Sequence, residues 1–268
     1  MTKSQSVLST KWLISIAIAL AAFVTEPAIS VADSQKPKVR LLETMTWYTE
    51  EYPPFNFKGA DGVPSGMTID ILMAAFEKID ADLVAADITI APWNRSYKYI
   101  QNRPGTALFS MTYTPERRKI MRFVGPSVPS NIAVIARTNR AASPPVTAAL
   151  TNLRIGVVRD DIGDQLIREI TTGSMKIQRK NSLKQLLYLL DAGRVDVIAY
   201  ASDVFRHAVK KSGGDPAAYE EVMTLKEGQL GYAFHRDTDP EVLVPLQAAI
   251  DELRADGTID RIVAKYRN

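Results

Sequence analysis

A pattern of short apolar strands alternating with amphipathic helices runs through the chain twice, and it constrains the fold more than any other feature. The first run opens with a predicted strand at residues 38–47. The second opens at residues 153–158, after an Ala/Ser/Pro-rich segment at residues 139–150. A helix in the first run has one apolar stripe at helical spacing, formed by Ile69, Leu72, Met73, Phe76 and Ile79. Such alternation is typical of α/β layers with mostly parallel strands.

The remaining elements follow the same rhythm. In the first run we expect strands at residues 86–90 and 121–124, and a helix that opens at Pro92-Trp93. In the second run we expect helices at residues 162–170, 182–193, 202–211 and 240–255, and strands at residues 176–178, 195–201 and 221–225.

Two strands that resemble sheet edges, NIAVIAR at residues 131–137 and QLGYAFH at residues 229–235, bracket the second run. If both cross between the layers, the second layer is an insertion and the last helices return to the first. We therefore predict a two-lobed α/β fold, with lobe 1 at residues 33–134 and 234–268 and lobe 2 at residues 135–233. Two crossing strands make a hinge, and a hinge between two lobes creates a cleft.

The first 32 residues are predicted to be a signal peptide that lies outside the fold. They combine a basic start (Lys3 and Lys11), an apolar run from Trp12 to Val24, and small residues at Ser30 and Ala32, the third and first positions before the predicted cleavage point. A membrane-spanning helix needs about 20 apolar residues, so this run is too short to remain as an anchor. We expect export and cleavage between Ala32 and Asp33, with an uncleaved anchor as the alternative.

Composition narrows the class of protein further. The chain has no cysteine, which excludes a lipid-modified cysteine at the cleavage point, disulfides and thiolate metal sites. We therefore expect a free periplasmic or secreted protein. After removal of the predicted signal peptide, 31 basic and 29 acidic residues remain. This near balance predicts neither nucleic-acid binding nor polybasic attachment to membranes.

The sequence offers little material for catalysis. Its two histidines, His207 and His235, are far apart in the chain, and the motifs HExxH, GxGxxG, GxSxG and the P-loop are missing from it. A zinc site or a histidine-assisted nucleophile would need such residues. We therefore expect a binding protein that uses no metal or cofactor.

The segment FSMTYTPER, at residues 109–117, suggests recognition chemistry. Ser110, Thr112 and Thr114 occupy every second position, which places three hydroxyls on one side of an extended strand. Arg117 follows the strand and could close over whatever these hydroxyls contact. The alternative is an ordinary polar strand, with Arg117 as a second surface charge beside Arg118.

Two aromatic residues lie where ligands commonly bind. Tyr52 is in the proline-rich loop YPPF after the first predicted strand, and Trp93 opens a helix after another strand. Loops and helix starts at the carboxyl ends of strands form ligand sites in α/β sheets. Tyr52 and Trp93 could therefore sandwich a small ligand, or they could simply cover the core.

The order of the motifs YPPF, GxxxDIL, TPER, GRVD and DGTIDRIVAKY resembles the extracellular solute-binding proteins of family 3. These are periplasmic receptors of ABC importers for polar amino acids. The resemblance covers residues 39–266. It implies a two-lobed fold that closes around a small carboxylate-bearing ligand and delivers it to a membrane permease. We expect the protein to act as a monomer.

The resemblance also implies roles for individual residues. The family's threonine–x–x–arginine element matches Thr114 to Arg117, so Arg117 would bind the ligand carboxylate. A guanidinium suits this task because its donors grip both oxygens at once. Ser110 and Thr112 would add hydrogen bonds, while Tyr52 and Trp93 would clamp the ligand.

Two departures from the family pattern concern lobe 2. The acid that usually binds the ligand amine is replaced by Ala201, and the nearest acid is Asp203. The loop after the first strand of lobe 2 carries Asp160 and Asp161 where small residues are usual. These aspartates either cap the following helix or replace the amine acceptor. Tyr200 could add a hydroxyl.

Two further functions remain open from the sequence. Periplasmic cyclohexadienyl dehydratases share the predicted fold and would need a carboxylic acid of raised pKa. Glu50, Glu51 and Asp161 are the conceivable acids. A ligand-sensing adaptor for a membrane partner would use the same binding chemistry.

Overall fold

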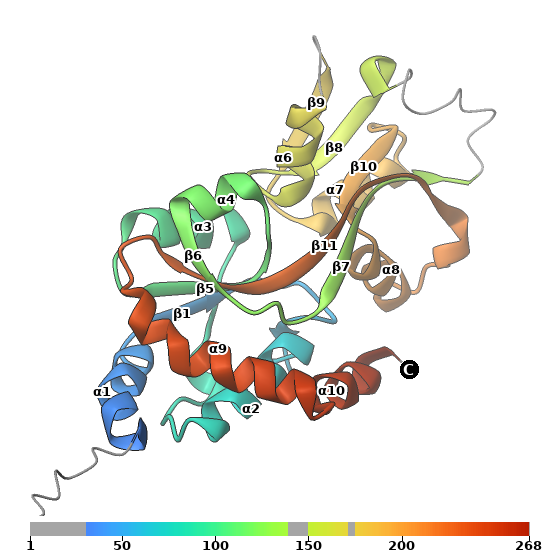
Figure 1. The fold of residues 1–268 in the computed structure, drawn as a ribbon. Coiled ribbons are helices and arrows are strands. Elements are labelled where there is room, and N and C mark those ends of the chain that lie inside the picture. The colour runs from blue at the N-terminus through green and yellow to red at the C-terminus, as the bar shows by residue number, and fades with distance from the viewer. Residues whose placement is uncertain (1–30, 139–149, 171–174, 268) are drawn as a thin grey trace, which may run out of the picture.

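The computed structural model describes residues 31–138, 150–170 and 175–267, and it shows two α/β lobes (Figure 1). Lobe 1 is built from the elements that precede residue 125 and from the last two helices. Its helices are α1 (Val31–Glu43), α2 (Met67–Lys78), α3 (Trp93–Asn102), α4 (Pro115–Ile120), α9 (Pro240–Ala255) and α10 (Thr258–Arg267). Its strands are β1 (Thr46–Thr49), β2 (Phe57–Lys58), β3 (Pro64–Ser65), β4 (Thr89–Ile90), β5 (Thr106–Thr112) and β6 (Met121–Val124).

Lobe 2 contains the second run of strands and helices. Its strands are β8 (Arg154–Val158), β9 (Lys176–Lys180) and β10 (Val197–Ala201), and its helices are α6 (Ile162–Glu169), α7 (Leu183–Asp191) and α8 (Ser202–Lys211). Strands β8, β9 and β10 pair in parallel, as do β4, β1 and β5 in lobe 1. Each lobe therefore contains a run of three parallel strands, but the antiparallel strands β6, β7 and β11 make the sheet mixed, where the sequence predicted mostly parallel sheets.

Two long strands join the lobes. Strand β7 (Pro129–Arg137) pairs with β10, and β11 (Tyr219–His235) pairs with β7 along its first half and with β5 and β6 along its second. The resulting order is β4-β1-β5-β11-β7-β10-β8-β9. Figure 1 shows β11 running from one lobe to the other beside β7. These strands occupy the place in which the sequence predicted the hinge.

The core of lobe 1 forms where the predicted apolar stripe of α2 meets the sheet. Ile69, Leu72 and Phe76 are buried. Phe76 meets Trp47 edge to face with ring centroids 5.3 Å apart, and Trp47 also contacts Phe234 of β11 at 5.5 Å. This packing fixes the carboxyl end of β1, from which the first loop of the site departs.

Three expectations about secondary structure were wrong. Residues 38–43 belong to helix α1, and the strand begins only at Thr46, because Val39 and Leu42 lie three residues apart on one buried helical face. The strand predicted at residues 86–90 is reduced to Thr89–Ile90 behind a 3-10 turn. The two strands expected at residues 221–225 and 229–235 are one continuous strand, β11.

The predicted signal peptide falls almost entirely on residues 1–30, which lie outside the described residues. The predicted cleavage point after Ala32 coincides with the first turn of α1. Within the described residues, every helix is too short or too polar to cross a membrane.

Candidate functional site

Arg117 is held inside the molecule by the start of α4. The hydroxyl of Thr114 caps this helix by accepting a hydrogen bond of 3.1 Å from the Arg117 amide. The Arg117 guanidinium is 1% exposed, and its Nη1 donates to the Thr112 carbonyl at 3.2 Å. Its Nε and Nη2 are buried without a hydrogen-bond partner among the described residues. Buried donors of this kind are rare, so two free donors on one guanidinium mark a place for an anion.

An aromatic platform lies next to this guanidinium. The Arg117 carbon Cζ is 5.2 Å from the ring centre of Trp93 and 5.5 Å from that of Tyr97, and the two rings stack on each other at 5.3 Å. Both aromatics belong to α3. Cation–π contact with the rings stabilises the charge where water has little access.

The first loop of lobe 1 adds an acid and a second aromatic. Glu50 and Tyr52 follow β1 directly, and both are buried. The Tyr52 ring stacks on Phe55 at 5.6 Å and meets the Tyr200 ring of β10 edge to face at 5.7 Å. The Tyr52–Tyr200 contact joins the two lobes.

Polar contacts also cross between the lobes. The Trp93 indole Nε1 donates to the Asp160 carbonyl at 2.9 Å. Gln165 of α6 donates to the Thr114 hydroxyl at 3.3 Å and to the Glu116 carboxylate at 3.2 Å. Helices α4 and α6 face each other across this junction in Figure 1. The lobes are therefore in a closed arrangement.

Asp160 and Asp161 contribute differently to the loop before α6. Asp160 has a left-handed backbone (φ 61°) and presents its carbonyl to Trp93, while its amide donates to Asp164 at 3.1 Å. Asp161 occupies the N-cap position of α6, but its side chain makes no capping hydrogen bond. Asp161 is 4% exposed, and its Oδ2 has no hydrogen-bond partner among the described residues. The capping interpretation of Asp161 is therefore wrong.

The charges of Arg117, Asp161 and Glu50 interact. Burial raises the pKa of Asp161 to about 6, although the Arg117 guanidinium and the Ile162 amide lower it. Burial and the neighbouring Asp161 raise the pKa of Glu50 well above its usual range, while Arg117 lowers it. Burial also raises the pKa values of Tyr52 and Tyr200, so both phenols stay neutral. One cation and two carboxyl groups thus share a buried site.

The expected row of three hydroxyls is not present. Ser110 has a positive φ of 59°, which breaks the alternation of β5, and its hydroxyl bonds to Asn56 and, at 2.9 Å, to Thr68. Thr114 lies beyond β5 and caps α4. Thr112 is buried and offers its carbonyl to Arg117. Ser110, Thr112 and Thr114 therefore hold Asn56, Arg117 and the start of α4 in place, and their hydroxyls do not form one row facing a ligand.

A cavity of about 290 Å³ lies between the lobes beside this cluster. Glu50 and Trp93 line it from lobe 1, and Val158, Leu183 and Tyr200 line it from lobe 2. Glu50 belongs to the charged cluster and the Trp93 ring lies beside Arg117, so the cavity adjoins the cluster and the two form one candidate site.

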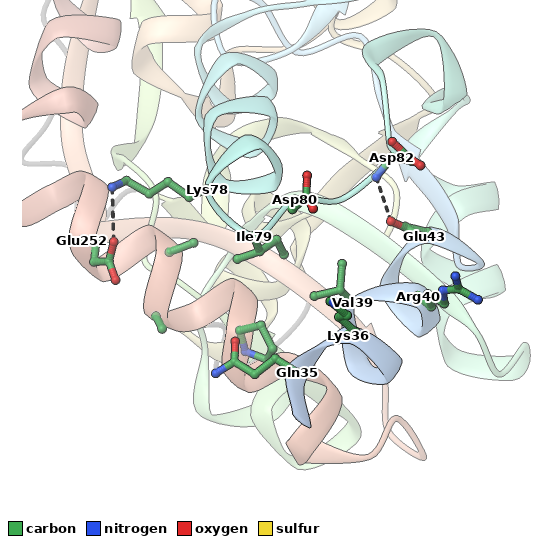
Figure 2. A pocket seen from close by; sticks show the side chains of 13 residues that line it. Gln35, Lys36, Val39, Arg40, Glu43, Lys78, Ile79, Asp80, Asp82 and Glu252 are labelled. Carbon is green, nitrogen blue, oxygen red and sulfur yellow. Dashed lines mark hydrogen bonds and ion pairs between the residues drawn. The ribbon is translucent and has the colours of Figure 1, made fainter. Parts of the chain in front are cut away.

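A second pocket, of about 510 Å³, lies on lobe 1 between α1, α2 and α9. Figure 2 shows two contacts among its lining residues: Lys78 binds Glu252 at 3.2 Å, and the Asp82 backbone amide donates to the Glu43 carboxylate at 2.7 Å. The predicted site residues do not line it. It is therefore a groove of lobe 1, separate from the site between the lobes.

Sequence reasoning missed Tyr97 and did not single out Glu50. Tyr97 follows Trp93 by four residues and so shares its helical face, which a helical wheel would have shown. Glu50 comes directly after β1, and the carboxyl-end rule that selected Tyr52 and Trp93 applies to it equally. In the described part of the chain, no three acidic or histidine side chains lie close enough together to hold a metal ion.

Comparison with known proteins agrees with the two-lobed fold. The chain is 28% identical over 222 residues to the L-arginine-binding protein of Pseudomonas aeruginosa, which covers 80% of this chain and 84% of the relative. A mutant of ArgBP from T. maritima superposes with a TM-score of 0.70 at 20% identity, over 88% of this chain and 98% of that one. An ancestral amino acid-binding protein, described as a precursor of cyclohexadienyl dehydratase, superposes with the same TM-score at 20% identity, over 87% and 99%.

These similarities extend through both lobes. Residues 45–268 match the family described as bacterial extracellular solute-binding proteins, family 3. The match includes β1, the α4 arginine, the loop before α6 and the returning helices of lobe 1. The chain therefore belongs to family 3 of the bacterial extracellular solute-binding proteins.

Proposed function

We propose that this protein captures an amino acid between its lobes as the periplasmic receptor of an ABC importer. The observation that carries the proposal is the pair formed by Arg117 and Asp161. The Arg117 guanidinium has two free buried donors, and the Asp161 carboxylate has a free buried oxygen. An α-amino acid carries one carboxylate and one ammonium, which complement these two groups.

The two groups belong to different lobes, so they also account for closure. Arg117 is on α4 of lobe 1 and Asp161 is at the start of α6 of lobe 2. A ligand that pairs with both gains its full binding free energy only in the closed arrangement, and it therefore shifts the population towards that state. In this proposal Asp161 binds the ligand ammonium in place of the acid that the family usually has at the position of Ala201.

The remaining predicted site residues support the ligand around this pair. We propose that Tyr52, Trp93 and Tyr200 enclose the body of the ligand, and that Asp160 holds Trp93 through its carbonyl. Ser110 and Thr112 stay in the proposed site as supports of Asn56 and Arg117. The lobe boundaries at residues 134/135 and 233/234 are proposed to flex with β7 and β11.

We further propose export to the periplasm through cleavage of the predicted signal peptide, and binding without catalysis. The curated relatives that match the chain are binding proteins. A dehydratase would instead use Glu50 or Asp161 as an acid. Incubation with prephenate or arogenate distinguishes a binding protein from a dehydratase, because an aromatic product appears only if the protein is an enzyme.

A thermal-shift screen of the purified chain without its first 32 residues tests the proposed function. The panel contains the common L-amino acids and matched small carboxylates without an amine. A ligand that binds only the folded state raises the melting temperature. We expect amino acids to raise it and the amine-free carboxylates to have little effect. A panel in which no amino acid stabilises the protein would contradict the proposal.

A further inference from the structure

When Glu50 is ionised, the charges of the site do not cancel against an ordinary zwitterion. Arg117, Asp161 and Glu50 are 1%, 4% and 8% exposed, so all three are shielded from water. The carboxylate and ammonium of an amino acid would pair with Arg117 and Asp161. Glu50 would then remain as a buried carboxyl group without a countercharge, which is costly if it is ionised.

The surroundings of Glu50 indicate which ligand group could neutralise its charge. Glu50 lines the 290 Å³ cavity together with the aromatic Trp93 and Tyr200 and the apolar Val158 and Leu183. None of the described residues that line the cavity is a lysine or an arginine, and the other charged one is the exposed Glu51. A ligand side chain in this cavity therefore meets negative charge and apolar walls.

We infer that Glu50 accepts the cationic end of the ligand side chain, so that the site selects a basic amino acid over neutral and acidic ones. This inference rests on the proposed function and names the class of ligand for the same site. A basic amino acid carries one net positive charge, and the ionised site carries one net negative charge. The complex is then neutral, with each buried charge paired.

The groups around Glu50 predict that a proton leaves when such a ligand binds. Asp161 faces Glu50 from α6 and Arg117 faces it from α4, while the neutral phenols Tyr52 and Tyr200 complete its surroundings. Burial and Asp161 favour the protonated form of Glu50 in the free protein. A cation beside the carboxyl group favours the ionised form, so binding releases the proton to the solvent.

The experiment compares L-arginine with L-citrulline, its neutral counterpart of nearly the same shape, by calorimetry on the wild type and on Glu50→Gln. We expect the wild type to prefer arginine by at least ~30-fold, the effect of one buried charge pair, and Glu50→Gln to bring the ratio close to one. Glu77→Gln is the matched control, and we expect it to change the ratio by less than about threefold, because this exposed carboxylate lies on α2, does not line the cavity and is screened by solvent.

The outcomes separate the two proposals. If neutral amino acids bind as tightly as arginine, or if folded Glu50→Gln keeps the wild-type preference, the inference is wrong and the proposed function stands. If no amino acid binds the wild type, both fail. Should Glu50→Gln not fold, wild-type titrations of arginine and citrulline in two buffers of different ionisation enthalpy decide, because the ammonium that both ligands share also displaces protons from Asp161. More proton release with arginine than with citrulline supports the inference, and equal release contradicts it.

Discussion

The two carboxylates at the start of α6, Asp161 and Asp164, have the same chemistry and nearly the same burial but opposite surroundings. Asp164 is 1% exposed, accepts hydrogen bonds from Arg179 at 3.0 and 3.1 Å, and receives the Asp160 amide. Asp161 is 4% exposed, and its Oδ2 has no hydrogen-bond partner among the described residues. Asp164 therefore holds the loop in place, whereas Asp161 is kept in an unfavourable environment that a ligand can relieve.

The largest effect on the free energy of unfolding is expected from Asp164→Asn. The substitution leaves Arg179 without its countercharge and weakens the loop before α6. We expect the free energy of unfolding to fall by about 3 kcal/mol, the low end for breaking a buried ion pair, since Arg179 is partly exposed. Chemical denaturation measures this, with Asp161→Asn as the matched control. An equal loss of stability in both variants would show that the two aspartates are equivalent.

Arg117→Ala tests the cation of lobe 1 that lies near the unpaired Asp161 of lobe 2. Its loss leaves Asp161 and Glu50 without the nearest cation. We expect amino-acid binding to weaken by about 2–5 kcal/mol, the range for removing one partner of a buried charge pair. Calorimetry with the best ligand of the thermal-shift screen measures the change. Arg118→Ala is the control, since Arg118 is exposed beside the same turn. Unchanged affinity in Arg117→Ala would remove Arg117 from the site.

Asp161→Asn tests whether Asp161 is unpaired, because it should change how the free energy of unfolding depends on pH. The pKa of Asp161 is raised from 3.8 to about 6, so the ligand-free folded state binds a proton that the unfolded chain has already lost. The stability from this group is complete below pH 3.8 and lost as the pH rises through about 6. We expect the wild type to lose about 2 kcal/mol relative to Asp161→Asn between pH 4 and pH 7. Parallel pH profiles for the two proteins would contradict the unpaired state of Asp161.

The smallest effect is expected from Gln165→Ala, which removes an exposed contact between the lobes. Gln165 bonds to Thr114 and Glu116 only when the lobes meet. We expect ligand affinity to fall by about 0.5–1 kcal/mol without loss of stability, the usual worth of a solvent-exposed hydrogen bond. Calorimetry and thermal denaturation measure the two quantities. Loss of stability with unchanged affinity would show that the contact serves the fold and not closure.

Much of the site could be predicted because its residues follow strand ends. Tyr52 and Trp93 were predicted from their place after a strand or at the start of a helix. Arg117 was predicted from the row of hydroxyls before it and from the family's threonine–x–x–arginine element, and Asp161 from a departure from the family pattern in the loop after a strand. Glu50 stood out less, because a carboxylate in a loop is ordinary until its burial is known. The role of Ser110 also escaped prediction, since its left-handed backbone turns the hydroxyl towards Asn56.

The sequence by itself determined the two-lobed α/β architecture, since strand–helix periodicity and the two bracketing strands are local patterns. It also determined which residues lie at strand ends. Only the tertiary structure decided that Arg117, Asp161 and Glu50 share one buried site, because their charges come from chain segments far apart in sequence. Whether a carboxylate is paired or free depends on which groups the fold brings beside it, and no local pattern contains that information.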